Sequence, residues 1–390
     1  PVKDRSTDIA RNGDNIYIVY QSVGTNHQDS IYYSTSTNGG DSWPPSPSLI
    51  TKGIHPRIGI DGANIQCVYS NNPDASGYEI YHRLSTDGGT NWSSEQPLTV
   101  AERNSWHPAV SVNANLIHIA WADNRGIDPQ NYEIYYDKST NQGATWIYGS
   151  TYGYQFEMDQ YVSEYSDIVA YTDPNYQSVH VAWSDDKQLP GPGIYYRRST
   201  DNGSSWINAV RLLEGGHYPS IDADSRGLYV VCEKNADIWY IESTNWGASW
   251  NSPINITNSS VYHDSFPDIK ANNMGRHVVF TRPGGDYGYP QIYYIQRDIV
   301  VPSAPANLRK DPLCVPPPVV LLWNATSEPD LYDYRVYRRL LPIGKWAIIG
   351  TSKNPNYTDN TVSGGYWYEY YVTARDLALN ESSASNVIKV

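Results

Sequence analysis

The chain contains few cysteines, and their arrangement argues against a disulfide framework. Among its 390 residues only Cys67, Cys232 and Cys314 are cysteines, which is an odd number. Cys67 and Cys232 stand inside apolar runs, where a buried free thiol is the expected state. Cysteine usage therefore does not indicate the compartment of the protein.

Charge is also scarce, and its balance is acidic. Charged residues make up 18% of the chain, and the formal net charge is −13. An acidic surface without a basic cluster does not attract phosphate backbones, so nucleic acid is not an expected partner. No apolar run reaches the length of a transmembrane helix. The sequence begins at Pro1 without an initiator methionine, which fits either a removed signal peptide or a shortened N-terminus. We expect an extracellular or cell-surface protein.

Phenylalanine is rare, whereas the other two aromatic residues are abundant. The chain has 3 Phe against 35 Tyr and 13 Trp. Tyrosine and tryptophan combine an apolar ring with a polar atom, so they suit half-buried strand positions and binding surfaces.

One eight-residue stretch, Ser85-Thr-Asp-Gly-Gly-Thr-Asn-Trp92, recurs five times. Every copy has Ser first, Asp or Asn third, Gly fifth and Trp eighth, and the tryptophans follow one another at intervals of 44 to 60 residues. An Asx side chain and a Ser hydroxyl can bond nearby backbone N–H groups, and the Gly supplies a positive φ. The Trp is large enough to wedge the turn against its own strands. The third and eighth residues of the copies are Asn38 and Trp43, Asp87 and Trp92, Asn141 and Trp146, Asp201 and Trp206, and Asn245 and Trp250.

The repeated turn belongs to a larger repeated unit of short strands. Residues 107–112, 116–121 and 132–139 alternate apolar and polar side chains and run into one copy of the turn, after which a fourth strand must follow. Four antiparallel strands in 40–50 residues are typical of a propeller blade. Units begin near Ser6, His55, His107, Ser166, His217 and Ser265, so we predict an all-β, six-bladed β-propeller over residues 1–300.

The sixth unit lacks the repeated turn and has only three strands. Its fourth strand would have to come from the N-terminus, where about five residues precede the first strand. We therefore predict an imperfect seam, and an open edge there allows self-assembly by strand addition.

The repeated turn resembles the Asp box, or BNR repeat, of the sialidase superfamily. That resemblance implies a six-bladed propeller in which the boxes have a structural role on the face away from the ligand site. It also implies, for a sialidase, three arginines that hold the substrate carboxylate, an Asp acid/base and a Tyr nucleophile with a Glu. Arg11-Asn-Gly and Arg57-Ile-Gly do not match the sequence around the first of these arginines.

The sequence pattern changes at Val301, where a Pro-rich stretch, Val301-Pro-Ser-Ala-Pro305, marks a boundary. Residues 301–390 contain short alternating strands, which predict an immunoglobulin-like β-sandwich. Pro-x-x-Leu, Trp323, the Tyr-x-Tyr-x-Val-x-Ala run of residues 368–374 and Asn-Glu-Ser resemble a fibronectin type III domain. By that resemblance Tyr368 is the corner tyrosine.

The predicted ligand face lies opposite the repeated turns, where loops lead into each first strand and join the second strand to the third. His55-Pro and His107-Pro head first strands and have two interpretations, strand capping or ligand contact. The candidate ligand-binding residues are His55, Arg103, Trp106, His107, Asp123, Asn124, Arg125, Asp185, Asp186, His217, Tyr218, Glu233, His263 and Arg282.

Trp121-Ala-Asp123-Asn-Arg125 and Trp183-Ser-Asp185-Asp186 give the candidate catalytic residues Asp123, Arg125 and Asp185. Each carboxylate could accept a sugar hydroxyl or act as a general acid, and Arg125 could grip a carboxylate. The alternative is an Asp123–Arg125 ion pair that holds the loop. No compact spacing indicates a metal or other cofactor, although Asp-rich loops are compatible with a structural calcium ion.

Three functions fit these features. The first is a secreted or cell-surface protein that recognises a glycan or polysaccharide with the aromatic and acidic side chains of the ligand face. The second is a sialidase-like glycosidase or other polysaccharide-active enzyme on the same face. The third is a structural subunit of an extracellular assembly.

Overall fold

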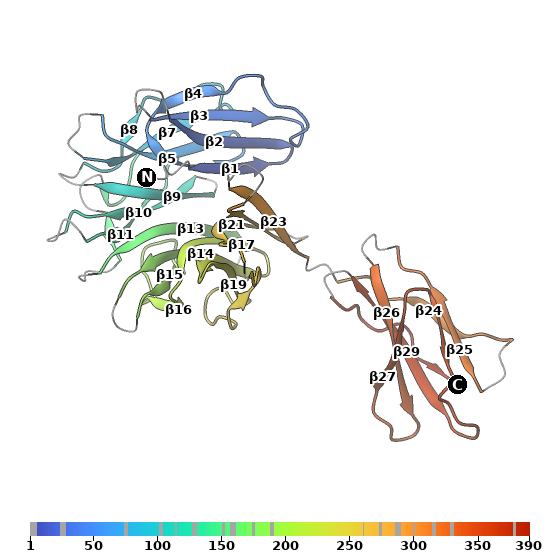
Figure 1. The fold of residues 1–390 in the computed structure, drawn as a ribbon. Helices are drawn as coiled ribbons and strands as arrows, with labels where there is room; N and C mark the ends of the chain where they lie inside the picture. Colours follow the sequence, from blue (N-terminus) through green and yellow to red (C-terminus); the bar gives the residue numbers. More distant parts are fainter. Residues whose placement is uncertain are drawn as a thin grey trace. The chain divides into compact units, whose positions relative to one another are not determined.

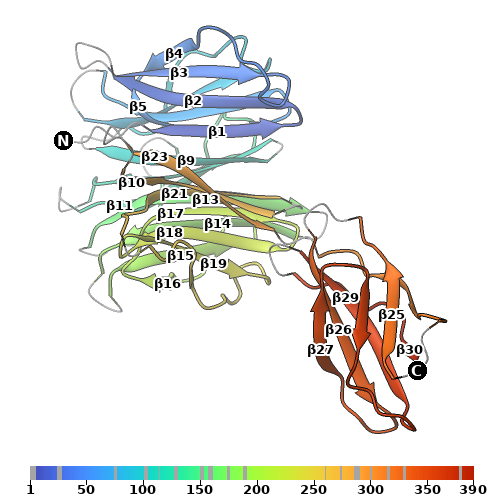
Figure 2. The same ribbon diagram turned by 45° about the vertical axis from the view of Figure 1, so that its right-hand side comes forward.

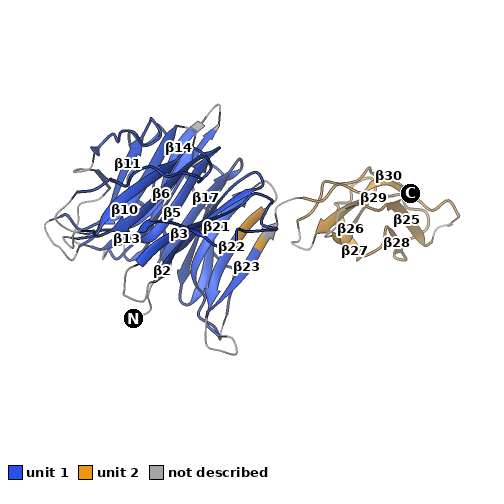
Figure 3. Ribbon diagram, turned by 90° about the horizontal axis from the view of Figure 1, so that it is seen from above, with its two compact units in different colours: residues 1–271, 278–295 blue, residues 272–277, 296–390 orange. Residues whose placement is uncertain are grey.

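The structure is a computed structural model that describes residues 6–23, 29–73, 77–100, 104–113, 115–126, 131–149, 153–156, 161–173, 176–187, 191–259, 261–272, 275–284, 290–298, 301–313, 317–327, 331–376 and 380–390. It divides into two compact units, one of residues 1–271 and 278–295 and the other of residues 272–277 and 296–390 (Figure 3). The fold is all-β (Figure 1). Within these residues, no helix is both long enough and apolar enough to cross a membrane.

The first unit contains antiparallel sheets that follow one another in chain order, which the colours from blue to yellow in Figure 2 trace. We number them sheet 1 to sheet 6. Sheet 1 has β1 (Thr7–Asn12), β2 (Asn15–Val23), β3 (Asp29–Ser36) and β4 (Ser48–Lys52). Sheet 2 has β5 (Ile54–Asp61), β6 (Asn64–Asn71), β7 (Glu79–Ser85) and β8 (Gln96–Pro97). Sheet 3 has β9 (Ser105–Asn113), β10 (Leu116–Asp123), β11 (Glu133–Ser139) and β12 (Tyr154–Gln155).

The remaining sheets of this unit repeat the pattern, with one difference in the last. Sheet 4 has β13 (Ser163–Asp173), β14 (Tyr176–Asp185), β15 (Gly193–Ser199) and β16 (Val210–Glu214). Sheet 5 has β17 (His217–Asp224), β18 (Gly227–Lys234), β19 (Asp237–Ser243) and β20 (Ile254–Asn255). Sheet 6 has the three strands β21 (Ser265–Asn272), β22 (Gly275–Arg282) and β23 (Gln291–Asp298). The expected closing strand would come from residues 1–5, which lie outside the described residues.

Hydrogen bonds join the first strands of successive sheets. In each, an Asp side chain on one first strand accepts from a backbone N–H on the first strand of the following sheet. Asp8 on β1 accepts from the Ile58 N–H on β5 at 2.8 Å, and Asp167 on β13 accepts from Ile221 on β17 at 2.9 Å. The Asp222 carboxylate accepts from the Ala271 N–H on β21 at 2.7 Å. These bonds satisfy strand N–H groups that have no partner within their own sheet, and they fix the sheets in sequence around the unit.

The charge of Lys270 on β21 connects sheet 6 with several other sheets. Four carboxylates, of Asp268, Asp222, Asp8 and Asp167, raise the pKa of its ammonium group more than burial lowers it. Asp8 belongs to sheet 1, and Figures 1 and 2 both place β23 next to β1. The last sheet therefore returns to the first.

The repeated turns follow the third strands of sheets 1 to 5 and share one hydrogen-bond network. In the turn after β15 the Ser199 hydroxyl donates to Asp201 at 2.7 Å and accepts from the Gly203 N–H at 2.7 Å, while Asp201 accepts from the Ser205 N–H at 2.8 Å. Gly203 has a φ of 75°. The other four turns repeat these bonds.

The tryptophans of four turns, those of sheets 2 to 5, contact a ring of the preceding sheet, and Trp206 and Trp146 also pack against clusters that include their own sheets. Trp206 meets the ring of Tyr136 on β11 edge to face at 4.8 Å. The same contact joins Trp92 to Tyr33, Trp146 to His82 and Trp250 to Tyr196. A ring at this position covers the crevice between two sheets, where it buries more apolar area than against one sheet.

The core of the first unit consists of clusters between neighbouring sheets. Ile31, Ile58, Ile65 and Cys67 pack between sheets 1 and 2, and Cys232 belongs to the corresponding cluster of sheets 4 and 5. Both thiols are free and buried, and burial raises their pKa. Cys314 lies outside the described residues.

The second unit has two antiparallel sheets around one core. One contains β24 (Ala306–Lys310), β25 (Val319–Asn324) and β28 (Asn356–Asp359), and the other β26 (Leu331–Leu340), β27 (Ala347–Ser352), β29 (Tyr368–Asp376) and β30 (Ile388–Lys389). Trp323 on β25 meets Tyr334 on β26 at 5.2 Å between the sheets. The Tyr368 hydroxyl accepts a hydrogen bond from the Ser363 N–H at 3.2 Å.

Candidate functional site

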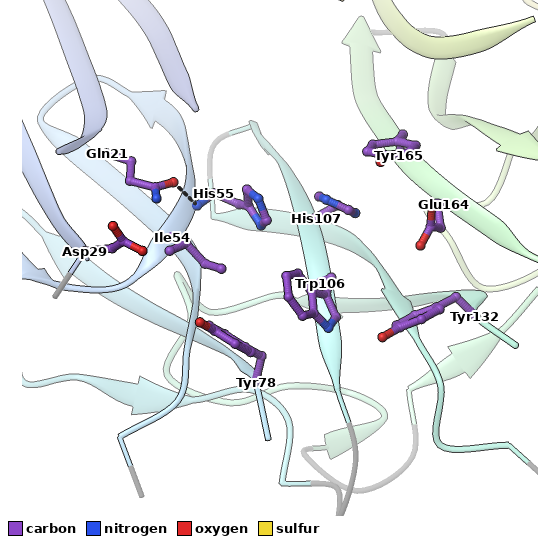
Figure 4. Close-up of a pocket in the computed structure, with 10 residues that line it drawn as sticks. All are labelled: Gln21, Asp29, Ile54, His55, Tyr78, Trp106, His107, Tyr132, Glu164 and Tyr165. Carbon is purple, nitrogen blue, oxygen red and sulfur yellow. Dashed lines mark hydrogen bonds between the residues drawn. The ribbon is translucent and has the colours of Figure 1, made fainter. Parts of the chain in front are cut away.

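A pocket of about 430 Å³ opens at the end of the first unit opposite the repeated turns. Strand β3 shows the geometry, because it begins with Asp29 in the pocket and ends with Ser36 in a repeated turn. The lining comes from sheets 1 to 4, from the starts of first strands and from the connections of second strands to third strands. The lining residues are Gln21, Asp29, Ile54, His55, Tyr78, Trp106, His107, Tyr132, Glu164 and Tyr165 (Figure 4).

Five rings at equivalent positions of consecutive first strands form a row across this face. We call His55, His107, Tyr165, Tyr218 and Phe266 the aromatic row. Successive ring centroids lie 4.6, 4.4, 4.5 and 4.6 Å apart, although each residue belongs to a different sheet, from sheet 2 to sheet 6.

All five residues of the aromatic row have a left-handed backbone. Their φ angles are 53°, 49°, 55°, 51° and 51° in chain order, a conformation that L side chains rarely adopt. The strand register shifts beside the row residues of sheets 2 to 5, as at a β-bulge, and a bulge re-aims a side chain out of the alternating pattern. The same strained backbone thus occurs at one position in five sheets, and the bulge determines where these rings point.

Indole and phenol rings complete one wall of the pocket. Trp106 lies 4.6 Å from the ring of Tyr78 and 5.8 Å from that of His55, centroid to centroid. Tyr132 lies across Trp106 from Tyr78 (Figure 4), and burial raises the pKa of its hydroxyl. These faces can stack on the C–H face of a sugar ring.

Two carboxylates face the pocket from different sheets. Glu164 of sheet 4 and Asp29 of sheet 1 stand on opposite sides, with the rings of His55 and His107 between them (Figure 4). Burial raises the pKa of Glu164, and the nearby charge of Asp186 raises it further. The Oδ1 atom of Asp29 is buried and has no hydrogen-bond partner within the described structure. The pocket therefore contains two carboxyl groups, Glu164 and Asp29. Glu164 keeps its proton to a higher pH than an ordinary glutamic acid does.

The two pocket histidines are neutral at pH 7. Burial lowers the pKa of His55 to about 4, with help from the positive charge of Arg57. Burial, then His55 and Arg57, place the pKa of His107 well below its usual value. The Nδ1 atoms of both rings are buried without a hydrogen-bond partner among the described residues. The side chains therefore line the pocket instead of capping a backbone carbonyl through Nδ1.

Asp123 and Asp185, predicted as candidate catalytic residues, take part in matching buried networks. Asp123 accepts hydrogen bonds from Ser105 at 2.8 Å and from the Trp121 indole at 3.0 Å, and it pairs with Arg125. Asp185 accepts from Ser163 at 3.1 Å and from Trp183 at 3.2 Å, and it pairs with Lys187 at 2.8 Å. These contacts favour the structural alternative, an ion pair that holds the loop.

Their neighbours Asn124 and Asp186 hold the loops that lead into first strands. The Asn124 side chain accepts from the Asn104 N–H at 2.8 Å, and Asp186 accepts from the Val162 N–H at 2.6 Å. Asp186 does not line the pocket, but its charge raises the pKa of Glu164, which does.

The remaining predicted residues that the structure describes do not line the pocket. His263 bonds Glu233 at 2.8 Å, and Arg282 makes two hydrogen bonds with Asp264, at 2.6 and 2.7 Å. His217 precedes Tyr218 of the aromatic row, and its ring lies 6.4 Å from that of Tyr218. Arg103 lies outside the described residues.

The sequence analysis missed seven of the ten lining residues, among them Glu164 and Asp29. A signal existed for sheet 4, because Tyr165-Ser-Asp-Ile168 aligns with His55-Pro-Arg-Ile58 and Phe266-Pro-Asp-Ile269. That alignment places Glu164 beside a row position. Asp29 has no such signal in the sequence. Among the described residues, no group of three or more His, Cys, Asp or Glu side chains is arranged to hold a metal ion.

Comparison with known sequences gives one partial match. No protein-family model matches the chain. An amylopullulanase from Thermoanaerobacterium thermosulfurigenes is 30% identical over 148 residues, which cover 35% of this chain and 7% of that protein. The chain thus spans a small fraction of the length of this relative.

Similar solved structures include two carbohydrate-active enzymes. An α-L-arabinanase from Penicillium chrysogenum, in complex with arabinobiose, has a TM-score of 0.52 and 13% identity, covering 76% of this chain and 94% of that one. The polysaccharide lyase Uly1 has a TM-score of 0.54 and 10% identity, covering 75% and 77%. At these identities the likeness concerns the fold, a β-propeller.

Proposed function

We propose that the chain is a polysaccharide-active enzyme whose active site is the pocket between sheets 1 and 4. The observation that carries the proposal is the pair of carboxylates, Asp29 and Glu164, on opposite sides of a pocket lined by aromatic rings. Most glycoside hydrolases use two carboxylates on either side of the scissile bond. The names of the arabinanase, the lyase and the amylopullulanase guide the choice of substrates to test.

Glu164 has the character of a general acid. Its raised pKa keeps it protonated to higher pH, so it can donate that proton to the glycosidic oxygen as the C–O bond breaks. Asp29 accepts the proton of the water molecule that adds to the anomeric carbon. One water molecule is consumed, and each carboxyl group returns to its first state when the proton passes from Asp29 back to Glu164.

The lining argues against a sialic acid as substrate. None of the ten lining residues, all in the described part of the chain, is an arginine, and both charged members are acids. A carboxylate on the sugar would meet Asp29 and Glu164 without a cationic partner. The proposed substrate is therefore an uncharged sugar, and the sialidase resemblance extends to the architecture and not to the substrate.

The finer features predicted from the sequence belong to the same proposal. We propose that sheets 1 to 6 are the blades of a six-bladed propeller, that the repeated turns are Asp boxes and that residues 301–390 are a fibronectin type III domain. The five shared turn networks and the two sheets around Trp323 support these assignments. A polysaccharide substrate also supports an extracellular or cell-surface location.

The test is hydrolysis of uncharged polysaccharides, with arabinan and pullulan as probes. Reducing ends are measured for the wild-type protein, for Glu164→Gln and for Asp29→Asn. The matched control is Glu214→Gln, since the Glu214 side chain is 73% exposed and lies outside the pocket. We expect turnover that both pocket variants reduce by at least about a hundredfold and the control leaves unchanged. Full activity of Glu164→Gln would refute the proposed acid.

A second candidate is glycan binding without turnover, which the continuous aromatic row favours. Binding of the same polysaccharides with no release of reducing ends would select it. The third candidate, assembly, rests on the side chains of β23, where Ile292 is 79% and Tyr294 55% exposed. Sedimentation of the wild-type protein as a monomer at high concentration would exclude self-assembly through this strand.

A further inference from the structure

The aromatic row continues past the pocket, and we propose that it binds an uncharged glycan chain of several sugar units that leaves the pocket over Tyr218 and Phe266. This inference rests on the proposed function, that the pocket takes carbohydrate. The last ring inside the pocket is Tyr165, which meets Tyr218 at 4.5 Å, and Tyr218 meets Phe266 at 4.6 Å. The rings lead from sheet 4 to sheet 6 without a break.

Phe266 is the residue that core packing does not explain. The chain has three phenylalanines, and Phe156 and Phe280 are buried in cores between sheets. Phe266 is 51% exposed and has a left-handed backbone with a φ of 51°. Exposure of an apolar ring to water is unfavourable, and the strained backbone is a second unfavourable contribution to the stability of the fold. A ligand that covers the ring accounts for this cost.

We call Tyr218 and Phe266, the part of the aromatic row beyond the pocket, the extension. The charged side chains near it are paired with one another, which favours an uncharged ligand. Asp264 and Arg282 form a two-bonded pair, and the Asp264 side chain is fully buried. The guanidinium of Arg282 also lies over the ring of Tyr262, 4.9 Å from its centroid. Glu233 is bonded to His263. An anionic chain would gain no unpaired cation from these groups, whereas an uncharged chain can stack on the rings.

The extension predicts that affinity depends on the length of the chain. A ligand of two sugar units fits within the pocket and leaves Tyr218 and Phe266 uncovered. A ligand of six units reaches the rings of sheets 5 and 6 and gains their contact area. The exposed ring of Phe266 therefore contributes to long ligands alone.

The test measures binding of oligosaccharides of two and six units from arabinan and from pullulan by isothermal titration calorimetry. All variants carry Glu164→Gln, so that the probes are not cleaved. Phe266→Asn removes the ring with a residue that tolerates the left-handed backbone, and Phe266→Trp keeps a ring. The control is Ile292→Asn, which removes an exposed apolar side chain elsewhere on sheet 6. Thermal unfolding confirms that each variant is folded.

We expect Phe266→Asn to weaken binding of the six-unit probe by about threefold to tenfold and to leave the two-unit probe unchanged. Phe266→Trp and Ile292→Asn keep the advantage of the longer probe. If that advantage survives Phe266→Asn, the extension is wrong and the pocket proposal stands. If neither probe binds the Glu164→Gln protein, the extension is overturned, and hydrolysis by the wild-type protein decides the pocket proposal.

Discussion

The imidazole rings of His55 and His107 lie 4.6 Å apart, centroid to centroid, although they belong to different sheets. Both residues have a left-handed backbone and are uncharged at pH 7, and His55 is buried whereas His107 is half-buried. Two rings that would each carry a positive charge in acid therefore face each other beside Arg57.

The His55–His107 contact predicts a loss of stability in acid. The pKa of His55 is about 4 in the folded protein, below its value of 6.5 in the unfolded chain. A lowered pKa stabilises the fold above pH 6.5, and this contribution is lost as the pH falls toward 4. The loss reaches at most about 3 kcal/mol. His55→Phe, which copies the residue of sheet 6 at the same position, should reduce the acid sensitivity in thermal unfolding at pH 7 and pH 4.5. An unchanged pH dependence in this variant would contradict the prediction.

Gly203 should be far less replaceable than a glycine with a similar backbone elsewhere. A Cβ at Gly203 would overlap the hydroxyl of Tyr136, whereas Gly39 has nothing within 4 Å of its Cβ position. Their φ angles are 75° and 71°, so both alanine variants carry the same backbone strain. We expect Gly39→Ala to cost about 1 kcal/mol and Gly203→Ala about 1–3 kcal/mol more, measured by urea unfolding followed through tryptophan fluorescence. Equal costs would show that Tyr136 moves aside freely.

Removing Asp123 should act on stability and not selectively on the chemistry. Asp123→Ala removes the buried carboxylate that pairs with Arg125 and accepts hydrogen bonds from Ser105 and the Trp121 indole. Breaking one side of a buried pair typically costs about 3–5 kcal/mol. The double variant Asp123→Ala/Arg125→Met should recover part of that loss in thermal unfolding. A variant that loses turnover while its unfolding midpoint stays at the wild-type value would assign Asp123 to the active site.

Residues 301–390 should fold as a separate chain. Their two sheets enclose a core that includes Leu321, Trp323, Tyr334 and Val372. We expect one cooperative thermal transition by circular dichroism for the isolated segment, and Tyr368→Phe should lower its stability by about 1 kcal/mol because the hydroxyl accepts the Ser363 N–H. A segment that melts without a transition would show that it depends on the rest of the chain.

The sequence was sufficient for the fold class because its signals are local. Alternating side chains predict strands, and a turn repeated five times predicts repeated sheets, so the all-β propeller follows without knowledge of long-range contacts. The face of the pocket also follows, since a strand that ends in a repeated turn must begin at the other end of the unit. His55, Trp106 and His107 were found in this way.

The rest of the candidate site depends on packing that local patterns do not contain. The row position of sheet 4 is Tyr165, so a search for His-Pro passes over it and over Glu164 beside it. The sequence left Asp123 with two interpretations, because the neighbouring residues in the sequence are the same whether its carboxylate is exposed or buried and paired. Only the contacts with Trp121 and Ser105 distinguish the two.

The glycine of a repeated turn and the ring that covers it come from different sheets. Tyr33, Tyr136 and Tyr196 fill the space above Gly89, Gly203 and Gly247 of the sheet that follows, and Trp43, in the turn of sheet 1, is 38% exposed. A duplication or deletion of a single sheet during evolution would therefore separate each ring from its matching glycine, unless the borders of the exchanged segment kept the two together. These glycine–ring pairs lie at the repeated turns, away from the pocket. Substitutions around the pocket can therefore change specificity without separating any of the pairs.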